Sequence, residues 1–325
     1  MWKKIINSFN KDFIKINMNR CLHTVNESSL CTLCEDICPQ PALKIVNRKL
    51  QVDESQCSSC RLCVHVCPTE AIQKESEELE KYEQQIHERD TVYFACKEYG
   101  SKDTDVILPC VLSLTPEMLM ISALHNKKVY IVWDEKLCLS CHSNWTQKRC
   151  LEWIGDWNHH QMSEEKVEII ANKKNKLGIK PKLSKTDILF MKNNETNSMS
   201  RDRSDEVSKA AKTNKLPLTE RRRYLIAYID KANKVGRIPK SISEKVGLVN
   251  IRVTDNCQLC FKCSTVCPTG ALFHQDENGA KTLMFNPKSC INCDICEHSC
   301  IEIEKEPIKF EDIDAVSVLN KSIQY

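Results

Sequence analysis

Glycine and long apolar runs are what this sequence lacks. Only 7 of the 325 residues are Gly, and they form neither a GxG pair nor a GxxxxGK loop. The glycine-rich phosphate loops of nucleotide-binding enzymes are therefore excluded. No stretch approaches 18 apolar residues, so no segment is expected to span a membrane. The first residues, MWKKIINSFNKDFIKINMNRC, have no apolar core before a small-residue cleavage site, which predicts a cytoplasmic protein rather than a secreted one.

Cysteine, in contrast, is abundant, with 21 residues in the chain. Such a number indicates disulfides in a small secreted protein or metal sites in an intracellular one. Because secretion is not expected, the thiols should be reduced and available as thiolate ligands. We assign no catalytic residue, since no Ser–His–Asp grouping and no carboxylate pair has a catalytic spacing.

The formal net charge of +3 hides an asymmetry along the chain. Residues 161–250 hold 21 Lys and Arg against 11 Asp and Glu and contain no Cys. We interpret residues 161–249 as a basic, partly disordered connector between two cysteine-rich regions. The triplet of Arg221, Arg222 and Arg223 could suggest nucleic-acid binding, but a solvated charged connector is favoured. The helical spacing of Leu225 and Ile229 predicts one docking helix after it.

The cysteines fall into four runs. These are Cys31, Cys34 and Cys38, with Cys21 ten residues before Cys31; Cys57, Cys60, Cys63 and Cys67; Cys257, Cys260, Cys263 and Cys267; and Cys290, Cys293, Cys296 and Cys300. Three of the runs have the spacing CxxCxxCxxxC. Successive CxxC turns wrap the backbone around one iron–sulfur cubane, so three thiolates reach three irons, and the fourth Cys is directed to the other cluster of a pair.

This crossed pattern predicts four ligand sets, which we name sites A to D. Site A is Cys21, Cys31, Cys34 and Cys67; site B is Cys57, Cys60, Cys63 and Cys38; site C is Cys257, Cys260, Cys263 and Cys300; site D is Cys290, Cys293, Cys296 and Cys267. Structural zinc is the alternative, because CxxC pairs also bind zinc. Two departures stand out: nine residues separate Cys21 from Cys31, and Ile301 follows Cys300 where Pro is usual.

Residues 18–75 and 250–312 resemble the bacterial two-cluster ferredoxin family. The resemblance rests on the CxxCxxCxxxC runs and on the Pro that follows the last Cys at Pro39, Pro68 and Pro268. It implies two [4Fe–4S] clusters in each module, four in the chain. Short hairpins are expected between the runs, over 43–52 and over 271–285, where their apolar side chains would cover the clusters.

The segment between the first module and the connector has a pattern of alternating helices and strands. A solvated helix is expected over residues 73–90, followed by buried strands that end at Cys96 and Cys110. Thr115 and Pro116 then start a helix, and KVYIVW at 128–133 is another buried strand. Strand, helix and strand predict a small parallel α/β unit, in which sites gather at the carboxyl ends of the strands.

Residues 91–155 also resemble, more weakly, the delta subunit of methyl-viologen-reducing hydrogenases, an iron–sulfur protein. The features are LPC-x5-PE, the apolar strand, and CxxCHxN with Arg149 soon after. Three interpretations of Cys96, Cys110, Cys138 and Cys141 stay open: a further iron–sulfur cluster such as [2Fe–2S], a zinc site, or redox-active thiols. Cys150 is expected in the apolar core of a following helix.

The sequence thus predicts an α+β protein with two ferredoxin-like modules flanking a small parallel α/β domain. The expected boundaries are 1–75, 76–160, 161–249 for the basic connector, and 250–325. The predicted function is single-electron transfer through about four [4Fe–4S] clusters, as a subunit or docking partner of a larger oxidoreductase. Redox proteins are the expected partners, and nucleic acid is not. The alternatives are a thiol or heterodisulfide-type reductase that uses the middle cysteines, and a zinc-dependent nucleic-acid-binding adaptor.

Overall fold

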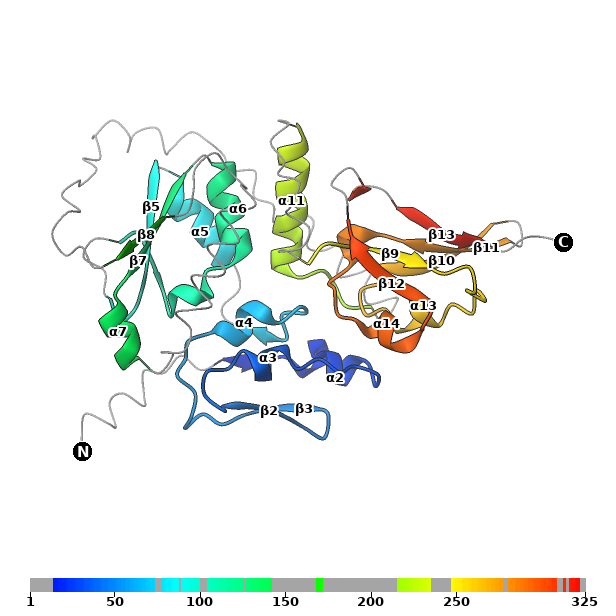
Figure 1. Ribbon diagram of the computed structural model, residues 1–325, viewed down its shortest axis with the longest axis horizontal. Helices are drawn as coiled ribbons and strands as arrows, with labels where there is room; N and C mark the ends of the chain where they lie inside the picture. The colour runs from blue at the N-terminus through cyan, green and yellow to red at the C-terminus, as the bar shows by residue number, and fades with distance from the viewer. Residues whose placement is uncertain are drawn as a thin grey trace.

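The computed structural model describes most of the two cysteine-rich regions and parts of the chain between them (Figure 1). The described residues are 14–73, 78–87, 89–99, 104–125, 127–141, 168–171, 215–234, 247–277, 280–308, 312–313 and 316–321. The predictions for Arg149 and Cys150, and for most of the basic connector, lie outside them. Among the described helices, none has the length and apolar character needed to cross a membrane.

The N-terminal module consists of short strands and single-turn helices. Its elements are β1 (Lys15–Ile16), η1 (Met18–Arg20), α2 (Leu22–Val25), α3 (Leu33–Asp36), β2 (Leu43–Val46), β3 (Lys49–Val52), α4 (Leu62–Val66) and β4 (Ile72–Gln73). Strand β1 pairs with β4, and β2 pairs with β3, both antiparallel. The predicted hairpin over 43–52 is present, and its turn residues Asn47 and Arg48 have φ of 51° and 63°. Leu43, Leu50 and Ile72 form the small core.

The middle region is a parallel α/β unit. It contains α5 (Glu78–Ile86), β5 (Thr91–Cys96), β6 (Val106–Leu108), η2 (Val111–Ser113), α6 (Pro116–Leu124), β7 (Lys128–Trp133), α7 (Glu135–Ser140) and β8 (Glu168–Ala171). All pairings in the order β6-β5-β7-β8 are parallel. Thr115 caps α6 as expected, since its hydroxyl accepts the Met118 amide at 3.2 Å. The expectation of a fully solvated helix before β5 is wrong, because Tyr82 and Ile86 on α5 are buried in the core.

The C-terminal module repeats the pattern of the first. Its elements are β9 (Val249–Val253), α13 (Lys262–Val266), β10 (Leu272–Glu277), β11 (Ala280–Phe285), η5 (Pro287–Ser289), α14 (Ile295–Ser299), β12 (Ile303–Pro307) and β13 (Ser317–Lys321). The antiparallel pair β9–β12 corresponds to β1–β4, and the hairpin β10–β11 corresponds to β2–β3. Strand β13 extends that hairpin on the β11 side. Leu272, Phe285 and Ile303 lie in its core.

Helix α11 (Glu220–Lys234) stands between the α/β unit and the C-terminal module (Figure 1). Leu225 and Ile229 are buried in the same core as α6, so the docking helix predicted there is present. The description of the arginine triplet as a solvated connector is wrong. Arg222 is 5% exposed, and each of the three side chains donates hydrogen bonds to backbone carbonyls. Arg221 and Arg222 thereby join α11 to the N-terminal and the C-terminal module.

Candidate metal centres

The thiols of site A line one hollow of the N-terminal module. Cys21, Cys31, Cys34 and Cys67 meet there with Leu22, Leu50, Pro68, Thr69, Ala71 and Ile72. Cys21 precedes α2 and Cys67 follows α4, so the fold closes the gap of nine residues that separates Cys21 from Cys31. The hollow is mostly apolar, which limits the access of water to the thiols.

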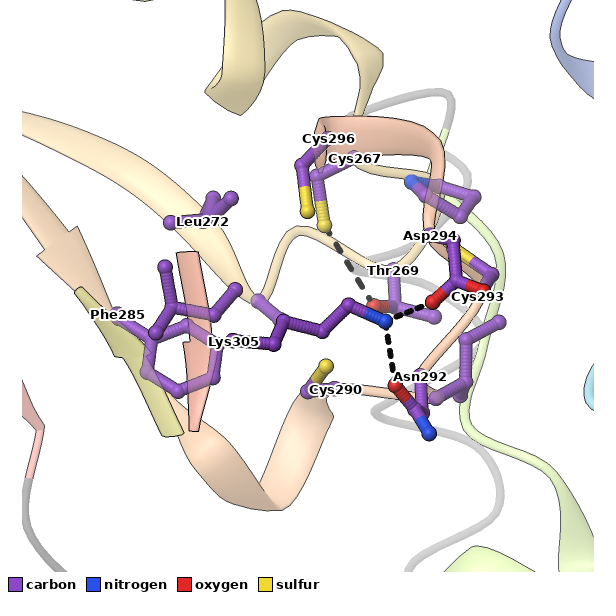
Figure 2. Close-up of a pocket in the computed structure, with 14 residues that line it drawn as sticks. Cys267, Thr269, Leu272, Phe285, Cys290, Asn292, Cys293, Asp294, Cys296 and Lys305 are labelled. Atoms are coloured by element: carbon purple, nitrogen blue, oxygen red, sulfur yellow. Dashed lines mark hydrogen bonds and ion pairs between the residues drawn. The ribbon is translucent and has the colours of Figure 1, made fainter. Parts of the chain in front are cut away.

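Site D lines the equivalent hollow of the C-terminal module (Figure 2). Cys267, Cys290, Cys293 and Cys296 surround it together with Leu272, Phe285 and Lys305. Cys267 belongs to the preceding run, yet it lies with the three thiols of the last one. The hydroxyl of Thr269 is 3.8 Å from the Cys267 sulfur, and Thr69 is 3.6 Å from the Cys67 sulfur in the first module.

At sites B and C, charge effects connect the predicted members of each site. After burial, the largest effects that raise the pKa of Cys63 are the charges of Cys60, Cys38, Cys34 and Cys57. Burial also raises the pKa of Cys263 to about 11, and the charges of Cys300, Cys257 and Cys260 add to this effect. The structure therefore brings the predicted members of each site within electrostatic range of one another. Because the charge of Cys34 in site A also raises the pKa of Cys63 in site B, the two sites lie within electrostatic range of each other.

The backbone of the regular runs has a repeated conformation. The residues on either side of the second Cys have positive φ in all three: Ser59 and Arg61, Leu259 and Phe261, Asn292 and Asp294, with φ between 50° and 64°. A non-glycine residue adopts this conformation at a cost of roughly 1–2 kcal/mol. No positive φ occurs among residues 31–38, where the irregular run instead forms α3. The left-handed residues turn amides toward sulfur, and the amides of Leu62, Asn292 and Ile295 stabilise the thiolates of Cys60, Cys290 and Cys293.

The donor set fits a cluster of several irons. Burial and the neighbouring thiols raise the pKa of Cys34 and of Cys293 to about 12, so four thiolates need a compensating positive charge. Thiolates are soft ligands that suit iron–sulfur clusters and zinc. Within the described residues, no three His, Cys, Asp or Glu side chains converge closely enough for a single metal ion. At sites A and D the four thiols surround a hollow, as expected for ligands of the separate irons of one cluster.

Comparison with known protein families agrees with this chemistry. Residues 50–73 match the model of a 4Fe-4S binding domain, and residues 256–302 match the model of a 4Fe-4S dicluster domain. The chain binds [4Fe–4S] clusters. No solved structure matches it. The matched family models do not support the resemblance of residues 91–155 to the hydrogenase delta subunit.

The four middle thiols gather at the carboxyl edge of the parallel sheet. Cys96 ends β5, Cys110 follows β6, and Cys138 and Cys141 lie at α7 after β7. Burial raises the pKa of Cys110 to about 12, with further effects from the charges of Cys60, Cys96 and Cys141. Burial likewise raises the pKa of Cys138 to about 11, and Cys96 and Cys141 add to it. The middle thiols thus form one group, and Cys60 connects that group to site B.

Sequence reasoning missed the polar residues that join the two modules. Lys215 donates to the carbonyls of Ser264, Thr265 and Cys267 at 3.0, 3.0 and 2.7 Å. Six residues later, Arg221 donates to the carbonyls of His65 and Cys67. The two side chains therefore bind equivalent turns, one in each module. The only sequence signal was their position in a basic segment, which is more often solvated.

Proposed function

We propose that the chain is an electron-transfer protein with four [4Fe–4S] clusters, a subunit or docking partner of a larger oxidoreductase, in which the two modules form one path. Each cluster would accept and release one electron at a time. The protein residues supply thiolate ligands, amide donors to sulfur and an apolar surround, and these determine the reduction potential. Sites A to D would each hold one cluster.

The observation that carries this proposal is the junction between the modules. Residues 215–222 contact the turn that follows α4 and the turn that follows α13. The first turn, 67–71, covers the hollow of site A, and the second, 267–271, covers that of site D. The Leu216 amide donates to the Pro268 carbonyl at 2.7 Å, and Arg20 donates to the carbonyls of Thr69 and Pro217. Sites A and D would be the pair across which electrons pass between modules.

The middle thiols would extend this path at the other end of the N-terminal module. The η2 turn after Cys110 packs beside α4, which carries Cys63 of site B. We propose that Cys96, Cys110, Cys138 and Cys141 are a further redox group next to site B. The order along the molecule would then be the middle thiols, site B, site A, site D and site C.

The two alternative functions make different demands on these residues. A thiol or heterodisulfide-type reductase would use the middle thiols as its active site, and the mutual charge effects of Cys96, Cys110, Cys138 and Cys141 support keeping this candidate. A zinc-dependent nucleic-acid adaptor would need free cationic side chains. Arg221 and Arg222 bind backbone carbonyls within the protein, which disfavours it.

Electron uptake by anaerobically prepared holoprotein tests the proposal. Titration with dithionite, followed by EPR, should show about four electrons taken up per chain by the ferredoxin-type sites. Uptake of two electrons or fewer by iron-replete protein would contradict the four-cluster path. Substrate turnover that is lost with Cys138→Ser, while this uptake is unchanged, would instead establish the reductase.

A further inference from the structure

Two cationic side chains are fixed beside site D. Arg222 comes from α11, and its Nε and Nη2 donate to the carbonyls of Lys288 and Pro287, each at 2.9 Å. These carbonyls belong to η5, the turn that ends at Cys290. Because Arg222 is 5% exposed, its guanidinium is held against this turn with little access to water.

Lys305 approaches site D from β12 and lines the same hollow (Figure 2). Its Nζ is 2.9 Å from Asn292 Oδ1, forms an ion pair with Asp294, and lies 3.4 Å from Glu297 Oε2. Asn292 and Asp294 flank Cys293 and have positive φ. Lys305 therefore fixes the left-handed turns of the ligand loop and also places a positive charge, paired with Asp294 and Glu297, in the lining of the hollow.

Both cations act electrostatically on the thiols of this site. Burial lowers the pKa of Arg222 to about 10 and lowers that of Lys305, whereas the charge of Cys290 raises both. With a pKa of about 10, Arg222 stays protonated at neutral pH. At Cys290 of site D, burial and the charge of Cys267 raise the thiol pKa, whereas the charges of Arg222 and Lys305 lower it.

We propose that Arg222 and Lys305 raise the reduction potential of the cluster at site D. The inference rests on the proposed function in that it requires a cluster at site D. Reduction adds one electron from a one-electron donor and one negative charge to the cluster, and no bond or proton changes. A fixed cation in a dry environment stabilises the added charge, and this stabilisation is strongest at low dielectric.

The test is an anaerobic redox titration of the full-length holoprotein, monitored by EPR. Lys305→Met removes the charge and keeps the aliphatic stem, and Lys305→Arg keeps the charge. We expect Lys305→Met to lower the potential of one cluster by at least the equivalent of a tenfold change in its ratio of reduced to oxidised form, which is about 59 mV for a one-electron couple. The Arg variant should keep the wild-type potential within a threefold ratio.

Arg252→Gln is the matched control. Arg252 lies on β9 and pairs with Glu304, the neighbour of Lys305 on β12, but it is exposed. Its removal should leave every potential unchanged. Arg222→Gln and Arg222→Lys repeat the comparison from α11, and Cys267→Ser identifies the signal that belongs to site D.

The outcomes separate this inference from the function on which it rests. If the Lys305→Met protein keeps its iron and all its potentials, the tuning role is refuted while the four-cluster function stands. If the wild-type C-terminal module holds no cluster, the proposed function itself fails. If Arg222→Gln protein loses iron because it misfolds, the two Lys305 variants decide, since their backbone contacts with α11 are intact.

Discussion

Glu70 and Gly270 occupy the same position in the two modules, each third after the last Cys of a run, and both have positive φ, 50° and 71°. Glycine adopts this conformation freely, whereas glutamate pays roughly 1 kcal/mol for it. The Glu70 carboxylate accepts the amides of Glu220 and Arg221 at 2.9 and 3.0 Å. It therefore caps the first turn of α11, where Thr219 also accepts the Arg222 amide at 3.1 Å. The two hydrogen bonds between Glu70 and α11 offset the cost of the positive φ at Glu70.

The first prediction concerns this cap. Glu70→Gly should remove the strain and the two amide bonds together, so the free energy of global unfolding should change by less than about 1 kcal/mol. Hydrogen exchange at the first turn of α11 should nevertheless increase, by roughly fivefold to tenfold. Exchange mass spectrometry of Glu70→Gly and Glu70→Gln checks this. Unchanged exchange in residues 220–224 would show that the Glu70 carboxylate does not stabilise the first turn of α11.

The second prediction concerns Lys215. Its ammonium caps the end of α13 through three carbonyls, and charge-assisted bonds of this kind contribute about 1.5–3 kcal/mol. Lys215→Met should loosen the turn that carries Cys267 and speed the release of iron to a chelator several-fold. Lys262→Met, an exposed position on α13 itself, should release iron at the wild-type rate. Equal rates for both variants would mean that the three hydrogen bonds of Lys215 do not slow the loss of iron from site D.

The third prediction is the crossed assignment of ligands. Cys267→Ser should alter the EPR signal of the cluster held by Cys290, Cys293 and Cys296, because its sulfur lies in their hollow. Cys300→Ser should alter the signal of the cluster held by Cys257, Cys260 and Cys263. If Cys267→Ser and Cys290→Ser perturb different signals, the crossed arrangement is wrong.

The fourth prediction separates the possible roles of the middle thiols. If they bind a further metal, Cys110→Ser should lower the metal content while the signals of sites A to D keep their intensity. If they form a redox-active dithiol that includes Cys110, the metal content stays the same, and reduction of the oxidised wild-type protein releases two thiols that it does not release in the variant; the second measurement is therefore the number of thiols released by reduction. A variant identical to wild type in both measurements would leave these residues only a packing role.

Much of the fold was predictable because periodic patterns determine local structure. The hairpin at 43–52, the strands β5 and β7, and the helix that starts after Thr115 follow from the spacing of apolar residues and a cap. The grouping of thiols at sites A and D was predictable from the cysteine spacing, because a CxxC turn has few conformations. Neither kind of reasoning needs contacts between distant parts of the chain.

The junction between the modules could not be predicted, because it depends on contacts between residues that are far apart in the sequence. Burial of Arg222 depends on carbonyls at 287 and 288, about 65 residues away in the sequence. A basic segment has the same composition whether water or backbone carbonyls surround it. The strain at Glu70 is visible in the sequence only as a Glu where the second module has Gly, and its reason appears only when α11 is in place.

Metal and acid-labile sulfide analysis of anaerobically reconstituted protein tests the central claim most directly. Four cubane clusters predict about 16 iron atoms and about 16 sulfides per chain, with a small addition if the middle thiols also bind a cluster. Zinc should be far below one equivalent at the four sites. Fewer than about eight irons per chain after full reconstitution, or stoichiometric zinc in place of iron, would contradict the account.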